Sequence, residues 1–69
     1  MNLIDGYVTE VLSYKVKKSS ELWELEAGEE DKINHIYEVK YVDEGGEHKK
    51  ELWFEYKNDD IKKGYHFLH

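Results

Sequence analysis

The stretch HIYEVKYVDEGGEHKKELWFEY, residues 35–56, decides the fold that we expect for this 69-residue chain. Apolar and polar residues alternate in 35–42 and again in 50–56, which is the pattern of strands with one buried face. The expected inward residues are Tyr37, Val39 and Tyr41 in the first half and Leu52, Phe54 and Tyr56 in the second. Gly45 and Gly46 can supply the positive φ angles of a tight turn. The stretch therefore predicts an antiparallel hairpin.

The two glycines, placed at the central positions of the turn, also predict a register. Val39 then faces Leu52 on the buried side, and a slip of one residue would turn every apolar side chain to the solvent. Lys40 faces Glu51 on the other side as an opposite-charge pair. A longer loop with a bulge is the alternative.

Residues 7–16 predict a long strand before the hairpin. Its inner face is expected to carry Val8, Leu12, Tyr14 and Val16, and its outer face Tyr7 and Val11. Apolar residues on both faces, with Glu10 interrupting the inner row, indicate a bent or bulged strand.

The acidic segment that follows can be interpreted in two ways. Residues 21–27 favour a second strand, because apolar residues alternate with acids throughout. The alternative is a short helix at 20–27, which Ser19 or Ser20 would cap and Gly28 would end.

Residues 58–64 predict one short helical turn, and residues 65–69 predict a short closing strand. The chain is therefore expected to be all-β or mostly β, with five strands in a single domain, 1–69. An α+β fold is the alternative if 20–27 is helical. From Gly6 to Leu68, the order and spacing of these elements resemble an SH3-like small barrel, whereas an OB-like barrel would carry a longer helix.

Negative charge is concentrated in one segment of the chain. The formal net charge is −6, and the sequence contains no Cys. Residues 21–31 hold six acids and no base: Glu21, Glu24, Glu26, Glu29, Glu30 and Asp31. Such a chain repels nucleic acid on average and favours a basic protein surface as a partner. No apolar run has the length of a membrane span, and residues 1–8 lack a signal-peptide pattern, so we expect a cytoplasmic protein without membrane contact.

The sequence offers no catalytic, cofactor or metal motif. Ser13, Ser19 and Ser20 lie in no nucleophile motif, and no glycine-rich loop precedes a helix. His66 and His69 would point to opposite faces of a strand and could not converge on one metal ion. We therefore expect a protein that is not an enzyme.

Trp53 lies on the polar face of its strand, where it is either exposed for binding or covered by another part of the chain. Tyr7 and Val11, on an equally unusual face, are the expected cover. The leading hypothesis is a protein-interaction or accessory module. Its proposed contact residues are the aromatic residues Trp53, Tyr7 and Trp23 and the acids Glu24, Glu26, Glu29, Glu30 and Asp31.

Two other functions fit less well. The acidic segment suits an inhibitor that mimics the charge of nucleic acid. The Lys and Tyr residues of 14–18 and 62–65 suit a weak single-stranded nucleic-acid binder, but the net charge opposes binding. Residues 65–68 carry few charges and could form an edge at which a second copy pairs.

Overall fold

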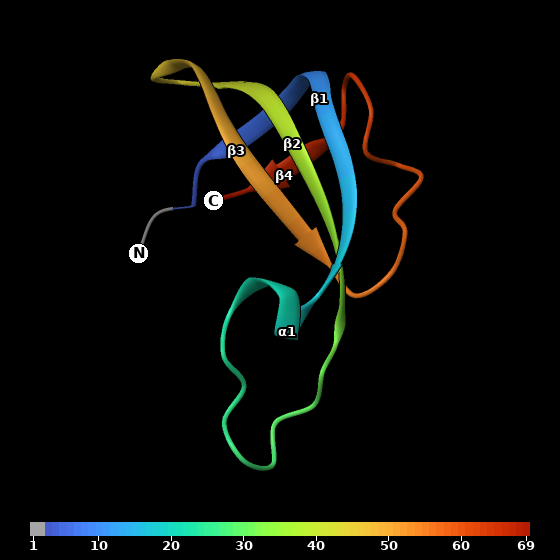
Figure 1. Ribbon diagram of the computed structural model, residues 1–69. Coiled ribbons are helices and arrows are strands. Elements are labelled where there is room, and N and C mark those ends of the chain that lie inside the picture. Colours follow the sequence, from blue (N-terminus) through green and yellow to red (C-terminus); the bar gives the residue numbers. More distant parts are fainter. Residues whose placement is uncertain (1–2) are drawn as a thin grey trace.

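The computed structural model describes residues 3–69, and within them the chain is mostly β (Figure 1). The elements are β1 (Asp5–Lys18), α1 (Ser19–Leu22), β2 (Ile33–Asp43), β3 (Gly46–Phe54) and β4 (His66–Leu68). The strands form one antiparallel sheet of order β3-β2-β1-β4, curled into a half-barrel. The all-β class is confirmed, but the prediction of five strands is wrong. Met1 and Asn2 of the predicted 1–69 domain lie outside the described residues.

The central hairpin forms, but its register is shifted by two residues from the predicted one. Asp43 pairs with Gly46, and Val39 pairs with Lys50 instead of Leu52. Gly46 has a φ of 113°, while Gly45 is not among the glycines with positive φ. The predicted turn requires positive φ at both central residues and therefore does not form.

The shift changes the charge pairs but not the faces, because side chains alternate with a period of two. Lys40 faces Lys49, and Glu38 faces Glu51. The predicted pair of Lys40 with Glu51 is therefore wrong. Like charges directly opposite each other destabilise a sheet.

Replacement of Lys49 by glutamate is expected to stabilise the fold by about 0.5 kcal/mol, because it turns a like-charge pair with Lys40 into an opposite-charge pair. Urea denaturation at low micromolar protein concentration measures the change. Lys63→Glu, at an exposed position outside the sheet, is the control for net charge. A Lys49→Glu variant less stable than this control would contradict the pairing of Lys49 with Lys40.

β1 is bulged, as predicted. Register shifts lie between Val8 and Glu10 and between Val11 and Ser13. The first shift places Val11 opposite Val39, on the concave face of the sheet. The prediction that Val11 faces outward is therefore wrong, because the bulge reverses the alternation after it.

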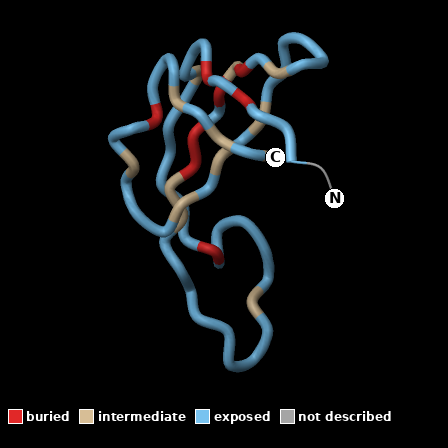
Figure 2. Tube along the Cα trace, turned by 180° about the vertical axis from the view of Figure 1, so that it is seen from behind, coloured by how far each residue is buried: buried red, intermediate tan, exposed pale blue. Residues whose placement is uncertain are grey.

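The core lies on the concave face of the sheet. Figure 2 shows the buried residues mostly in the part of the chain that forms the sheet. Its buried members are Val8, Tyr37, Val39 and Ile61, and Leu52, Phe54, Tyr65 and Phe67 pack against them. Tyr56 lies beyond the end of β3 and is 62% exposed, so its predicted inward position is wrong.

The predicted helical turn at 58–64 is replaced by two reverse turns. The N–H of Ile61 donates to the carbonyl of Asn58 at 3.3 Å, and the N–H of Tyr65 donates to that of Lys62 at 2.9 Å. Asn and Asp favour such turns over continued helix, because their side chains bond the nearby backbone. The predicted closing strand is confirmed as β4.

Residues 21–27 do not form the predicted strand. The alternative helix is present only as α1, and Trp23 already has an extended φ of −153°. Lys18 at the end of β1 pairs with Ile33 at the start of β2, so the segment between them leaves the sheet as a loop (Figure 1). We call residues 23–32 the acidic loop.

Candidate functional site

Two indole rings meet at the end of the sheet that carries α1. Trp53 belongs to β3, and Trp23 directly follows α1. Their ring centroids are 6.1 Å apart with an angle of 22° between the planes, a stacked arrangement. Trp23 is 45% exposed and Trp53 43% exposed. We call these two residues the Trp pair. Each ring covers part of the other, and the rest of each ring is open to solvent.

Ile36 lies on the same convex face of the sheet as Trp53, its ladder partner on β3. It alternates with the core residue Tyr37 along β2, so its side chain points away from the concave core. Ile36 is nevertheless only 1% exposed. We infer that the Trp pair covers it, which makes a second, small apolar cluster that attaches the acidic loop to the sheet.

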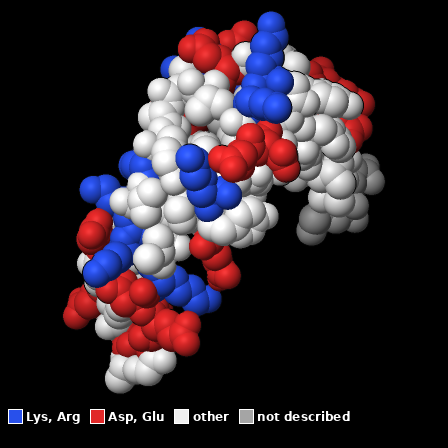
Figure 3. Space-filling view, turned by 90° about the vertical axis from the view of Figure 1, so that its right-hand side faces the viewer, with Lys and Arg blue, Asp and Glu red and all other residues white. Residues whose placement is uncertain are grey.

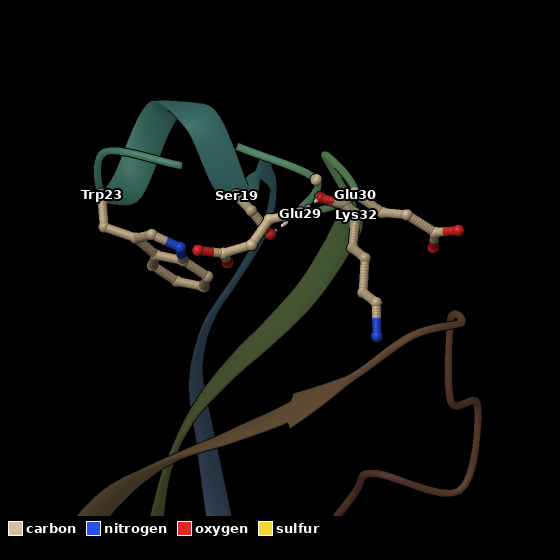
Figure 4. Close-up of a pocket in the computed structure, with 6 residues that line it drawn as sticks. Ser19, Trp23, Glu29, Glu30 and Lys32 are labelled. Carbon is tan, nitrogen blue, oxygen red and sulfur yellow. Dashed lines mark hydrogen bonds between the residues drawn. The ribbon is translucent and has the colours of Figure 1, made fainter. Parts of the chain in front are cut away.

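An open hollow lies between α1 and the acidic loop (Figure 4). Figure 4 shows Trp23 and Glu29 on one side of it and Glu30 and Lys32 on the other. Its lining residues are Ser19, Trp23, Gly28, Glu29, Glu30 and Lys32. A second hollow shares two of these residues and is lined by Glu30, Lys32, Ile33 and Glu55. One indole and the carboxylates of Glu29 and Glu30 therefore border the first hollow.

Two of the five predicted acidic contact residues hold the loop in shape. Asp31 accepts hydrogen bonds from the Ser20 backbone N–H at 2.8 Å and from the Ser20 hydroxyl at 2.7 Å. Glu29 accepts one from the Glu26 N–H at 3.0 Å. The Asp31 carboxylate binds the first turn of α1, whose N-cap residue makes no side-chain hydrogen bond.

The backbone and hydroxyl hydrogen bonds from Ser20 hold the pKa of Asp31 below its ordinary value of 3.8. These bonds favour the charged carboxylate, so their contribution to stability is full above the ordinary pKa and is lost as pH falls through the lowered one. We expect the Ser20 amide resonance to titrate with a midpoint below 3.8 in an NMR pH series. Asp31→Asn should remove this transition and Asp60→Asn should leave it, whereas a wild-type midpoint above the ordinary value would contradict the contact.

The other three predicted acids are exposed, and of these Glu30 lines the hollow. No ion pair within residues 3–69 involves Glu24, Glu26 or Glu30. Figure 3 shows acidic side chains gathered at the end of the molecule that the loop forms, with lysines among them. The Nζ atom of Lys32, which lines both hollows, lies 3.4 Å from Oε1 of Glu55, just beyond β3. These two residues border the site and were missed from the sequence.

The structure does not bring Tyr7 to the Trp pair. Tyr7 pairs with Val42, whereas Trp53 is opposite Ile36, about 20 Å further along β2 at the usual rise per residue. Tyr7 packs instead against His66, with ring centroids 5.0 Å apart. The interpretation that Tyr7 and Val11 cover Trp53 is wrong, because Trp23 does so. Tyr7 as a contact residue stays a separate prediction.

At the far end of the hairpin, the Asp43 carboxylate contacts two imidazole rings, an arrangement that the sequence did not predict. The Nε2 atoms of His48 and His69 each lie 3.1 Å from an oxygen of Asp43, and the Gly45 N–H donates to the same carboxylate at 2.7 Å. This contact joins the hairpin turn to the residue after β4. Within residues 3–69, no three His, Cys, Asp or Glu side chains are grouped so that they could hold a metal ion.

No family model, curated protein or solved structure matches this chain. Within residues 3–69, no helix has both the length and the apolar character that a membrane crossing requires. The proposed function is therefore based on the geometry of the Trp pair and the acidic loop.

Proposed function

We propose that this chain is a non-enzymatic protein-interaction module that binds a basic segment of a partner protein at the Trp pair. The observation that carries the proposal is a stacked, half-exposed pair of indoles beside the carboxylates of the acidic loop. Indole is the aromatic ring that attracts cations most strongly. A Lys or Arg side chain against Trp23 or Trp53 would gain this attraction and the field of the nearby acids.

The ion pair at the edge of the site suits exchange with a partner. Lys32 and Glu55 are 3.4 Å apart, and both side chains are more than half exposed. Exposed pairs of this kind contribute little to stability. A basic residue of a partner can therefore replace Lys32 beside Glu55 at small cost.

Two further features of the proposal rest on the sequence. The order of elements supports an SH3-like arrangement of the half-barrel, in which a curled sheet gives the loop a fixed frame. The acidic composition supports a cytoplasmic location.

Fluorescence anisotropy of labelled synthetic peptides tests the proposal. A peptide in which Lys alternates with Ser should bind, and a peptide of the same length with Glu in place of Lys should not. Trp53→Leu keeps an apolar cover over Ile36 and should weaken binding by about 10-fold or more, as expected for a Trp at the centre of an interface. Tyr56→Leu, at an exposed aromatic residue just beyond β3, is the matched control and should bind like the wild type.

Equal binding of both peptides, or an unchanged affinity of Trp53→Leu, would contradict the proposal. A third result separates it from the charge-mimic alternative. If replacing Glu24, Glu26 and Glu30 by glutamine abolishes binding while Trp53→Leu has no effect, the acidic loop acts by charge alone.

A further inference from the structure

Two charged residues of β3 lie opposite residues of the same charge on β2. Lys49 lies opposite Lys40, and in the next row on the convex face Glu51 lies opposite Glu38. Glu51 has a partner on β1, because its Oε2 lies 3.8 Å from the Nζ of Lys15. No ion pair within residues 3–69 involves Lys49. Since like charges directly opposite destabilise a sheet, pairing with β2 does not account for the charge pattern of β3.

β3 is also an edge strand. It stands at one end of the sheet order β3-β2-β1-β4, and β2 is its only neighbour among the strands of residues 3–69. Figure 1 shows it running along one side of the half-barrel. The outer row of backbone N–H and C=O groups of such a strand can pair with a strand of another molecule.

We propose that two copies of this chain pair along β3, antiparallel and related by a two-fold axis at Lys50. Lys49 of each copy then faces Glu51 of the other, and all nine residues of Gly46–Phe54 are paired across the interface. Each of the two charged rows of the joined sheet would contain, in order, Lys40 and Lys49 of one copy and Glu51 and Glu38 of the other. Opposite charges meet at the interface in both rows.

The neighbouring registers lack this complementarity. A slide of two residues in one direction places Lys49 opposite Lys49 of the second copy, and Glu47 opposite Glu51. The same slide in the other direction places Glu51 opposite Glu51. A register centred on His48 would place Glu47 opposite Lys49, but it would pair only residues 46–50 of each copy. The register centred on Lys50 pairs opposite charges in both rows and also uses the whole strand, and this favours a second copy over an unrelated strand as the occupant.

One like-charge contact remains in this register, because Lys50 of one copy faces Lys50 of the other across the two-fold axis. The side chain lies on the concave face, where its Nζ is 5.4 Å from the centroid of the Phe67 ring on β4. This attraction holds the ammonium group over its own half-barrel and away from the axis. Trp53 belongs to the paired strand, but its side chain lies on the convex face, and Trp23 and the acidic loop lie outside the paired residues. The dimer therefore adds to the proposed function and does not depend on it.

Sedimentation equilibrium of the full chain at physiological salt tests the dimer. We expect the wild type to dimerise reversibly. Lys49→Glu and Glu51→Lys should each raise the dissociation constant by about 10-fold or more, because the symmetry makes every substitution act twice. The exchanged variant, Lys49→Glu with Glu51→Lys, should recover the wild-type affinity. Lys63→Glu has the same net charge as Lys49→Glu and should dimerise like the wild type.

Lys49→Glu removes a like-charge pair within each copy, so loss of the dimer in this variant would not come from misfolding. Glu51→Lys removes such a pair as well but breaks the ion pair with Lys15, and urea denaturation checks that both variants are folded. A wild-type chain that stays monomeric at millimolar concentration overturns the proposal. So does a Lys49→Glu variant that dimerises as strongly as Lys63→Glu. An exchanged variant that stays monomeric overturns the register.

Discussion

Replacement of Ile36 by alanine is expected to destabilise the protein by about 2–4 kcal/mol, the usual loss for a buried isoleucine. A side chain on the convex face of an isolated sheet would be exposed, and its truncation would cost little. Ile36 is instead 1% exposed, opposite Trp53 and near the stacked Trp pair. A domain of this size has a total stability of roughly 3–5 kcal/mol, so the variant should keep only about 1 kcal/mol and be partly unfolded at room temperature.

Ile61→Ala is the matched variant for this test. Ile61 is 7% exposed and belongs to the concave core, and the same atoms are removed. Urea denaturation of both variants should show comparable losses of stability. A loss for Ile36→Ala well below that of Ile61→Ala would mean that the Trp pair does not cover this face.

Replacement of Gly6 by alanine is expected to destabilise the protein by about 1–3 kcal/mol through overpacking. Gly6 is buried on β1 and pairs with Phe67 of β4. A Cβ atom at Gly6 would lie 2.9 Å from Cζ of the Phe67 ring. The ring cannot move away freely, because it packs against Tyr41, Tyr65 and His69.

A double-mutant cycle with Phe67→Leu shows whether this contact is the cause. Leucine lacks the distal ring atoms that the new methyl group meets, so Gly6→Ala should cost about 1 kcal/mol less in that background. The free energies come from urea denaturation of the four proteins. Additive losses would show that the cost of Gly6→Ala arises from another contact.

The hairpin was predictable because alternation of polar and apolar residues reports directly on which face a side chain takes. Its register was not, because the glycine that adopts positive φ is set by the local turn, and Gly46 alone of the pair does so. The error is two residues, so the face of Val39 was right while its partner was wrong. The same limit applies to β1. A bulge was expected there, but the face on which Val11 lies depends on where along the strand the bulge falls.

In the acidic loop, the alternation of apolar and acidic residues led to the wrong prediction of a strand. Trp23, Leu25 and Ala27 alternate like a strand, but no strand edge is available to them, since Lys18 and Ile33 already pair at the base of the loop. The bonds from Ser20 to Asp31 replace the missing ladder. They join residues far apart in the chain, and no local pattern predicts them.

The candidate site was predicted in part. The sequence predicts both Trp23 and Trp53 as contact residues, Trp53 because it lies among charged residues on its strand, and the structure brings the two rings together. Lys32, Glu55 and the buried Ile36 were not identified, because their roles arise from the way the loop folds back on the sheet. The charge of the loop was visible in the sequence, but its use of Asp31 to bind Ser20 was not.

The contact between Trp23 and Trp53 is the central claim, since the cover of Ile36 and the proposed binding site both require it. A NOESY spectrum of the wild-type chain in solution measures it most directly. We predict cross-peaks between protons of the two indole rings, with further cross-peaks from the Ile36 methyl groups to Trp53. A Trp23 ring with cross-peaks only to residues of its own loop would contradict the account.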